Sequence, residues 1–169
     1  AEGGNAETAI VVSGFAPADS LVAGPVAFSQ GYPLLLVDKN SVPAETKKAI
    51  ADLGIKKIIV VGGENVVSKA VYNELGAHER YAGQSRIETS LKVAEKSFAG
   101  ATDFSIVGYL KLADAVGAAV NGNPIIYVKG DLSDVQDYLT KAPAANFTIF
   151  GGPLAVNKTV ENELKELLR

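Results

Sequence analysis

One sequence pattern occurs twice and constrains the fold more than any other feature of the chain. The apolar residues Ile58–Val61 run into the pair Gly62–Gly63 and then into a segment with apolar residues at helical spacing. The same order returns in Phe147–Phe150 and the pair Gly151–Gly152, at a constant offset of 89 residues. Such apolar runs are typical of buried parallel strands, and glycine accepts the tight turn that follows them. The chain therefore holds two copies of one α/β unit.

Strand and helix patterns alternate along the rest of the chain. We expect strands at 9–13, 34–37, 58–61, 104–108, 125–128 and 147–150. We expect helices at 19–29, 43–53, 67–75, 86–98, 111–120, 131–141 and 156–164. This alternation predicts a duplicated Rossmann-like or flavodoxin-like α/β fold, with parallel sheets and helices on both faces.

The boundary between the copies is predicted near residue 79, which gives one unit at 1–79 and a second at 80–169. A polar segment that begins at His78 leads into the helix at 86–98, with no strand predicted between them. The first unit has no counterpart of this helix, and we expect one only upstream of Ala1.

Composition excludes several classes of function. With 47% hydrophobic and 21% charged residues the chain can bury a core, and its net charge of −3 gives no general attraction to nucleic acid or anionic lipid. The absence of cysteine excludes disulfides, thiolate catalysis and cysteine-ligated zinc. No apolar run approaches the roughly 18 residues of a membrane span. No metal-ligand set, catalytic motif or cofactor motif is found, and the absence of methionine predicts a processed or excerpted chain.

Four motifs in a fixed order suggest a family. They are Ser13–Pro25, with the pattern Ser-Gly-x4-Asp-Ser-Leu-x-Ala-Gly-Pro, followed by Tyr32–Asp38, Val60–Gly63 and Arg80–Ser90. The chain resembles the cell wall binding repeat type 2 family over nearly its whole length. The resemblance implies an extracellular surface protein of a Gram-positive bacterium, held non-covalently by tandem units, usually three, to anionic wall polymers. The second copy departs from the pattern, since Gly108-Tyr109 replaces Ser13-Gly14.

The glycine pairs and two aspartates are the first candidate site residues. Gly62, Gly63, Gly151 and Gly152 lie at strand-to-helix turns, where free backbone N–H groups can bind phosphate. Neither copy has the G-x-G-x-x-G or P-loop pattern, so a purely structural turn is favoured.

Asp19 and Asp114 recur in the first turn of a helix that follows a strand. Capping is the favoured role, and the alternative is a ligand site at the carboxyl edge of the sheet.

The polar segment offers three further candidates. Arg80 and Arg86 suit the phosphate or carboxylate groups of a polymer, and the ring of Tyr81 suits the face of a sugar. The equally favoured alternative is that Arg86 and Glu88 pair or cap at the start of a helix.

These observations predict a non-catalytic binding module without cofactor or metal. Its expected partner is an anionic cell-wall polysaccharide or teichoic-acid-like polymer, and we expect contacts repeated by duplication to add up to firm attachment. One alternative is a self-associating module of a surface layer, with trimer-like packing of repeats favoured by small residues in the helix at 111–120. A small Rossmann-like nucleotide binder is the less favoured alternative.

Overall fold

The structure is a computed structural model that describes residues 7–169. The strands are β1 (Thr8–Ser13), β2 (Leu34–Val37), β3 (Lys57–Val61), β4 (Glu79–Tyr81), β5 (Asp103–Gly108), β6 (Ile125–Val128) and β7 (Asn146–Phe150). The helices are α1 (Pro17–Gln30), α2 (Ala44–Asp52), α3 (Lys69–Glu74), α4 (Arg86–Ser97), α5 (Leu112–Ala119), α6 (Gln136–Lys141) and α7 (Lys158–Leu167).

The strands form two parallel sheets, and β4, at the predicted boundary between the copies, belongs to the first. The first sheet has the order β2-β1-β3-β4, and the second has the order β6-β5-β7. All strand pairs are parallel, and Val12 of the central strand β1 is paired with Leu36 on one side and Val61 on the other. The duplicated α/β fold predicted from the sequence is confirmed.

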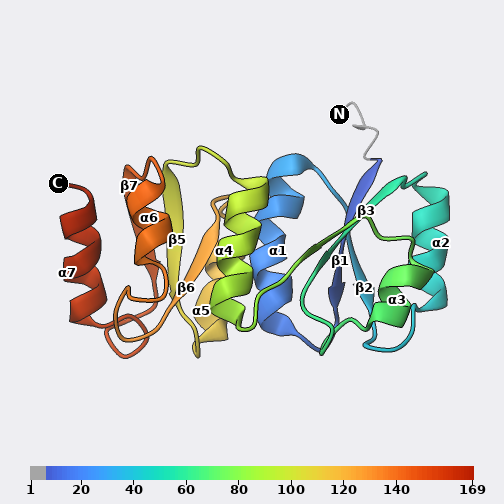
Figure 1. The fold of residues 1–169 in the computed structure, drawn as a ribbon, viewed down its shortest axis with the longest axis horizontal. Coiled ribbons are helices and arrows are strands. Elements are labelled where there is room, and N and C mark those ends of the chain that lie inside the picture. Colours follow the sequence, from blue (N-terminus) through green and yellow to red (C-terminus); the bar gives the residue numbers. More distant parts are fainter. Residues whose placement is uncertain (1–6) are drawn as a thin grey trace.

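The helices lie in layers around the sheets (Figure 1). Helices α1, α4 and α5 lie between the two sheets, α2 and α3 cover the outer face of the first, and α6 and α7 cover the outer face of the second. One apolar core runs through the middle layer and joins the two units, while a smaller core around Val11, Val60 and Val71 lies beneath α2 and α3. Close packing needs small residues here: a methyl group on Gly24 of α1 would lie only 3.2 Å from Cβ of Ala119.

Strand β4 is the main element that the sequence pattern did not predict. It adds to the first sheet, with Arg80 paired with Val60 and Tyr81 paired with Val61. Only one of its three residues is buried, so it has no apolar run to reveal it. Two helices are also shorter than expected, because turns occupy 64–67 before α3 and 131–135 before α6.

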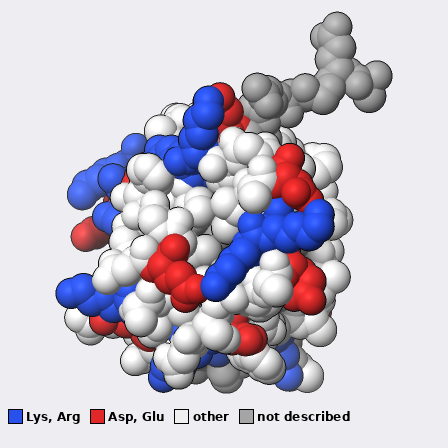
Figure 2. All heavy atoms as spheres, turned by 90° about the vertical axis from the view of Figure 1, so that its right-hand side faces the viewer, with Lys and Arg blue, Asp and Glu red and all other residues white. Residues whose placement is uncertain are grey.

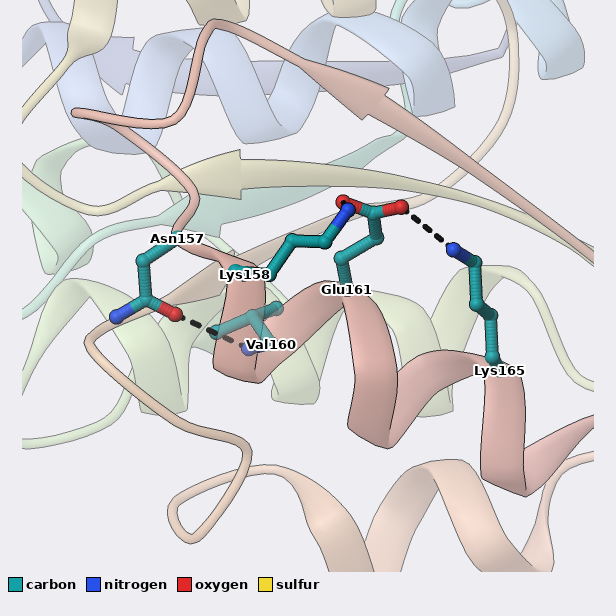
Figure 3. A network of polar contacts seen from close by, with 5 residues as sticks. All are labelled: Asn157, Lys158, Val160, Glu161 and Lys165. Atoms are coloured by element: carbon teal, nitrogen blue, oxygen red, sulfur yellow. Dashed lines mark hydrogen bonds and ion pairs between the residues drawn. The ribbon is translucent and has the colours of Figure 1, made fainter.

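Side-chain caps and ion pairs define the ends and surfaces of the helices. At the start of α7, Asn157 Oδ1 accepts a hydrogen bond from the Val160 N–H at 3.0 Å, and Glu161 contacts Lys158 and Lys165 (Figure 3). Helix α3 starts in the same way at Ser68, the counterpart of Asn157. The two helix starts share one capping position although their capping residues differ.

Positive and negative side chains alternate on the face that carries α2 and α3 (Figure 2). Lys47 lies 2.6 Å from Glu74, and Lys48 pairs with Asp52. Exposed pairs of this kind contribute little to stability, and they leave no broad basic patch on this face. Within residues 7–169, no helix combines the length and apolar character of a membrane span.

Candidate functional site

A cleft of about 320 Å³ opens at the carboxyl edge of the first sheet. Because β1, β3 and β4 are parallel, the loops that follow them meet at this edge. The side chains and backbone that shape the cleft include Phe15, Asp19, Gly63, Asn65, Gln84 and Arg86. Residues from three separate sequence motifs are thus brought to one site.

Asp19 lies inside this cleft, against the turn after β3. It is the third residue of α1, and a Cβ atom on Gly62 would lie 3.1 Å from its Oδ2 and 2.8 Å from Cγ2 of Val66. Gly62 also has a φ of 122°, which side chains rarely adopt, so only glycine fits this turn beside the carboxylate.

The carboxylate of Asp19 has no hydrogen-bonded partner within the described residues. Helix α1 has no side-chain cap hydrogen bond, so Asp19 lies in the first turn as predicted but does not satisfy an N–H group of this helix. Burial raises the pKa of Asp19, and the positive charge of Arg86 opposes this shift. A half-buried carboxylate with a perturbed pKa and unused acceptor atoms is a candidate ligand group.

Arg86 is the first residue of α4 and reaches the loop that follows β5. Its Nη1 donates a hydrogen bond to the carbonyl oxygen of Tyr109 at 2.7 Å. Its nearest opposite charge in the cleft is Asp19, but no carboxylate lies within 4 Å of Arg86 among residues 7–169. Arg86 does not pair with Glu88, which instead accepts a hydrogen bond from the Gln84 N–H at 2.9 Å and stabilises the helix start.

Arg80 and Tyr81 lie away from the cleft. Arg80 donates from Nη1 to the carbonyl oxygen of Gly62 at 2.7 Å, and its guanidinium lies 5.0 Å from the centre of the Tyr72 ring. Burial lowers the pKa of Arg80, while Glu64 opposes this shift. Tyr81 is only 5% exposed and belongs to the shared core, so its ring does not present a face to a sugar.

Gly63 and Gly152 are the second residues of the two glycine pairs, and both form local turns. The Gly63 carbonyl accepts from the N–H groups of Val66 and Val67, and the Gly152 carbonyl accepts from those of Ala155 and Val156. A Cβ atom on either glycine would meet nothing within 4 Å. Close packing therefore does not require glycine at these two positions.

The second unit repeats the contact between an aspartate and a glycine turn, but different residues line the cleft at this edge. Asp114 is the third residue of α5 and lies against Gly151, whose φ of 109° again requires glycine. The cleft beside it measures about 210 Å³ and is lined by Tyr109, Lys111 and Lys129 among others. Helix α5 also has no side-chain cap hydrogen bond, so Asp114 likewise lies in the first turn as predicted without satisfying an N–H group of its helix.

Three residues of the first cleft were missed by reasoning from the sequence. Phe15 is 82% exposed at the rim, and Asn65 and Gln84 contribute amide side chains. No motif identifies them. The signal that could have found them is position, since each lies in a loop that directly follows a strand of the first sheet.

Comparison with known proteins assigns the family. The profile of the Cell wall binding domain 2 (CWB2) family matches residues 2–72 and 80–161. The chain belongs to this family of binding domains, and the protein is therefore placed at the cell wall or cell surface.

Two curated relatives and two solved structures agree with this assignment. The chain is 30% identical over 168 residues to the N-acetylmuramoyl-L-alanine amidase LytC of Bacillus subtilis, and 30% identical over 171 residues to the Amidase enhancer of the same organism. These matches cover 96% of this chain but only 34% and 23% of the relatives.

Cwp8 from Clostridium difficile matches with a TM-score of 0.85 at 32% identity, over 96% of this chain and 29% of that one. Cwp6 from the same organism has the same fold, with a TM-score of 0.85 at 24% identity, over 96% and 28% of the two chains.

Proposed function

We propose that this chain is a non-catalytic module that anchors a surface protein non-covalently to an anionic polysaccharide or teichoic-acid-like polymer of the cell wall. The observation that carries the proposal is the pair of opposite charges in the first cleft. Asp19 and Arg86 line one cavity, yet no ion pair within 4 Å joins them in the described chain. Both therefore keep hydrogen-bonding capacity for a ligand.

The cleft offers complementary groups for a charged sugar polymer. The Asp19 carboxylate accepts hydrogen bonds from sugar hydroxyls, and the remaining N–H groups of Arg86 donate to a phosphate or carboxylate. Phe15 supplies an exposed ring at the rim against which a sugar can pack. Asn65 and Gln84 add amide groups that both donate and accept hydrogen bonds.

Duplication supports binding at more than one point along a repeating polymer. The second cleft carries Lys111 and Lys129, and Lys129 lies 5.9 Å from the centre of the Tyr109 ring. Asp134 lies 3.0 Å from Lys129 and partly neutralises it, so Lys111 is the stronger candidate for contact with an anion. Once one cleft holds the polymer, the other cleft meets it at a high effective concentration, so two weak contacts together bind more firmly than either alone.

Sedimentation with purified Gram-positive wall sacculi, before and after acid stripping of the anionic polymers, tests this proposal. We expect binding to intact sacculi, loss of binding after stripping, and weaker binding as salt rises. The substitutions Phe15→Ala and Asp19→Asn should weaken binding, whereas Leu53→Ala, an exposed apolar residue on the far side of the first sheet, should not. Equal binding to stripped and intact sacculi would contradict the anionic partner.

Self-association is the second candidate function. The observation that favours it is the exposure of Phe28 on α1, of Val116 on α5 and of Val120 directly after α5, since these two helices already join the units within the chain. Sedimentation velocity over a hundredfold concentration range tests this idea. A mass that stays that of a monomer throughout would count against it.

A further inference from the structure

The turn that joins α5 to β6 contains the dipeptide Asn121–Gly122, the one Asn-Gly pair in the sequence. Asn121 is exposed, and Gly122 has a φ of 80°. Among residues 7–169 the Gly122 N–H finds no acceptor, so no hydrogen bond protects it. Because glycine has no side chain, nothing on residue 122 shields this nitrogen from the side chain before it. The Gly122 nitrogen is therefore free to react with the Asn121 amide.

The side chain of Asn123 holds the amide that this nitrogen would attack. Its Nδ2 donates a hydrogen bond to Oδ1 of Asn121 at 2.7 Å. When a nucleophile attacks Cγ of Asn121, negative charge develops on Oδ1, and a donor that is already in place stabilises that charge. Asn123 therefore supplies the kind of stabilisation that an oxyanion hole supplies, with a single donor.

We propose that Asn121 is a self-modifying site that loses ammonia to its own backbone. The Gly122 nitrogen gives its proton to solvent and attacks Cγ of Asn121. The bond from Cγ to Nδ2 then breaks, and the amide nitrogen leaves as ammonia after taking a proton from water. Water opens the resulting five-membered imide at either carbonyl. The product is an aspartate, linked through its main chain or through its side chain, and the module gains one negative charge.

The first unit carries a matched turn that lacks these groups. Gln30–Gly31 stands in the place of Asn121–Gly122, because Pro33 and Pro124 follow the two glycines at the same distance and both carbonyls accept a hydrogen bond from the central strand of their sheet. Gly31 has a similar φ of 67°. A glutamine must close a larger, six-membered ring, and Tyr32, in the place of Asn123, has no amide to donate. We therefore expect the second unit to change with time while this turn of the first unit does not.

The modified turn lies away from both clefts. Residues 121–124 directly precede β6, so the turn is at the amino edge of the second sheet, whereas the clefts are at the carboxyl edges. The added charge should leave polymer binding unchanged. The reaction then records how long the module has been in place without altering what it binds, and it does not depend on the polymer proposal.

Peptide mapping by mass spectrometry tests the proposal on the whole chain, incubated at neutral pH and sampled over weeks. Deamidation appears as the mass gain that replaces an amino group by a hydroxyl. Asn40 is the internal reference, because it is exposed in a loop and is followed by Ser41. We expect Asn121 to react about tenfold faster or more, since it has both a glycine neighbour and the Asn123 donor. The rate should rise with pH, because the attacking nitrogen must lose its proton.

Three variants separate this chemistry from the exposure of the turn. Asn123→Ala removes the donor and should slow deamidation at residue 121 about tenfold. Asn121→Gln should abolish the reaction in this turn, and Gln30→Asn should create a slower one before Gly31. None of the three altered residues is buried, so Tm should change little in each case. Asn121→Asp, which carries the charge of the product, should bind wall sacculi as the unaltered chain does.

Two results would overturn the proposal. One is deamidation of Asn121 that is no faster than that of Asn40. The other is an Asn123→Ala variant that deamidates as fast as the unaltered chain or faster, because the hydrogen bond from Asn123 would then restrain Asn121 and not activate it.

Discussion

Replacing Gly62 with alanine should destabilise the protein far more than the same change at the adjacent Gly63. At Gly62 the new methyl group would lie 2.8 Å from Cγ2 of Val66 and 3.1 Å from Oδ2 of Asp19, and the φ of 122° disfavours any side chain. Backbone strain of this kind costs about 1–3 kcal/mol, and overpacking costs about 1–3 kcal/mol more. For a chain of this size these costs together correspond to a fall in Tm of about 5–20 °C.

Gly63 is the matched control, since a Cβ atom there would meet nothing within 4 Å. Alanine at Gly63 should change the free energy of unfolding by no more than about 0.5 kcal/mol. Thermal unfolding followed by circular dichroism measures both variants. A double variant that also carries Asp19→Ala should recover part of the loss, because one of the two close contacts is removed. Equal effects of alanine at Gly62 and Gly63 would refute the packing of the aspartate against the turn.

Further predictions concern buried polar groups. Tyr127→Phe removes the hydrogen bond from the Tyr127 hydroxyl to the Ala18 carbonyl, 2.9 Å in length, and should lower stability by about 0.5–1.5 kcal/mol in urea unfolding; an unchanged midpoint would show that this contact between the units contributes nothing. Ser105→Ala should be neutral or stabilising by up to about 1–3 kcal/mol, because the Ser105 hydroxyl is the one fully buried side-chain polar atom without a partner in residues 7–169; a clear loss of stability would indicate a partner for this hydroxyl. Burial raises the pKa of Asp19 in the folded state, so its ionised form opposes folding at pH 7. Relative to Asp19→Asn, the unaltered protein should therefore gain stability as pH falls through the folded pKa toward the ordinary value of 3.8, and urea unfolding at pH 7 and pH 4 should show this sign; a difference of the opposite sign would contradict the burial argument.

The overall fold could be predicted because duplication makes each pattern visible twice. The strand and glycine turn at Ile58–Val61 and Gly62 recur 89 residues later, so the second copy supports the interpretation of the first. Strand β4 was not predicted because it has no apolar run. It is a strand through its pairing with β3, which the sequence does not show. Glu79 and Arg80 are polar residues that lie in a sheet.

The candidate site was only partly predictable, because a sequence does not show which way a side chain points. Arg80 and Arg86 stand six residues apart in one motif, yet Arg80 holds the turn after β3 while Arg86 lines the cleft. Tyr81 lies next to Arg80 in sequence, but the alternation of a strand turns it into the core. Phe15 carries no motif, and its exposure is known only from the fold.

The aspartates show how far local rules could predict their position and contacts. A carboxylate in the first turn of a helix after a strand usually caps that helix. Asp19 and Asp114, which follow β1 and β5, lie against Gly62 and Gly151 in the turns after β3 and β7. Strands β1 and β3, like β5 and β7, are distant in the sequence but adjacent in the sheet. Recurrence in both copies was visible from the sequence, whereas this contact across the sheet was not.

The most direct test of the central claim is a map of where a wall polymer touches the protein. Soluble fragments of an anionic wall polymer would be titrated into isotope-labelled protein, and amide chemical shifts followed by NMR. Binding at the first cleft predicts the largest shifts in the loops at 15–19, 63–66 and 83–86, with smaller shifts at 109–111 and 129–130. Shifts confined to the α2–α3 face, or none at concentrations where sacculi are bound, would contradict the assignment of the cleft as the binding site.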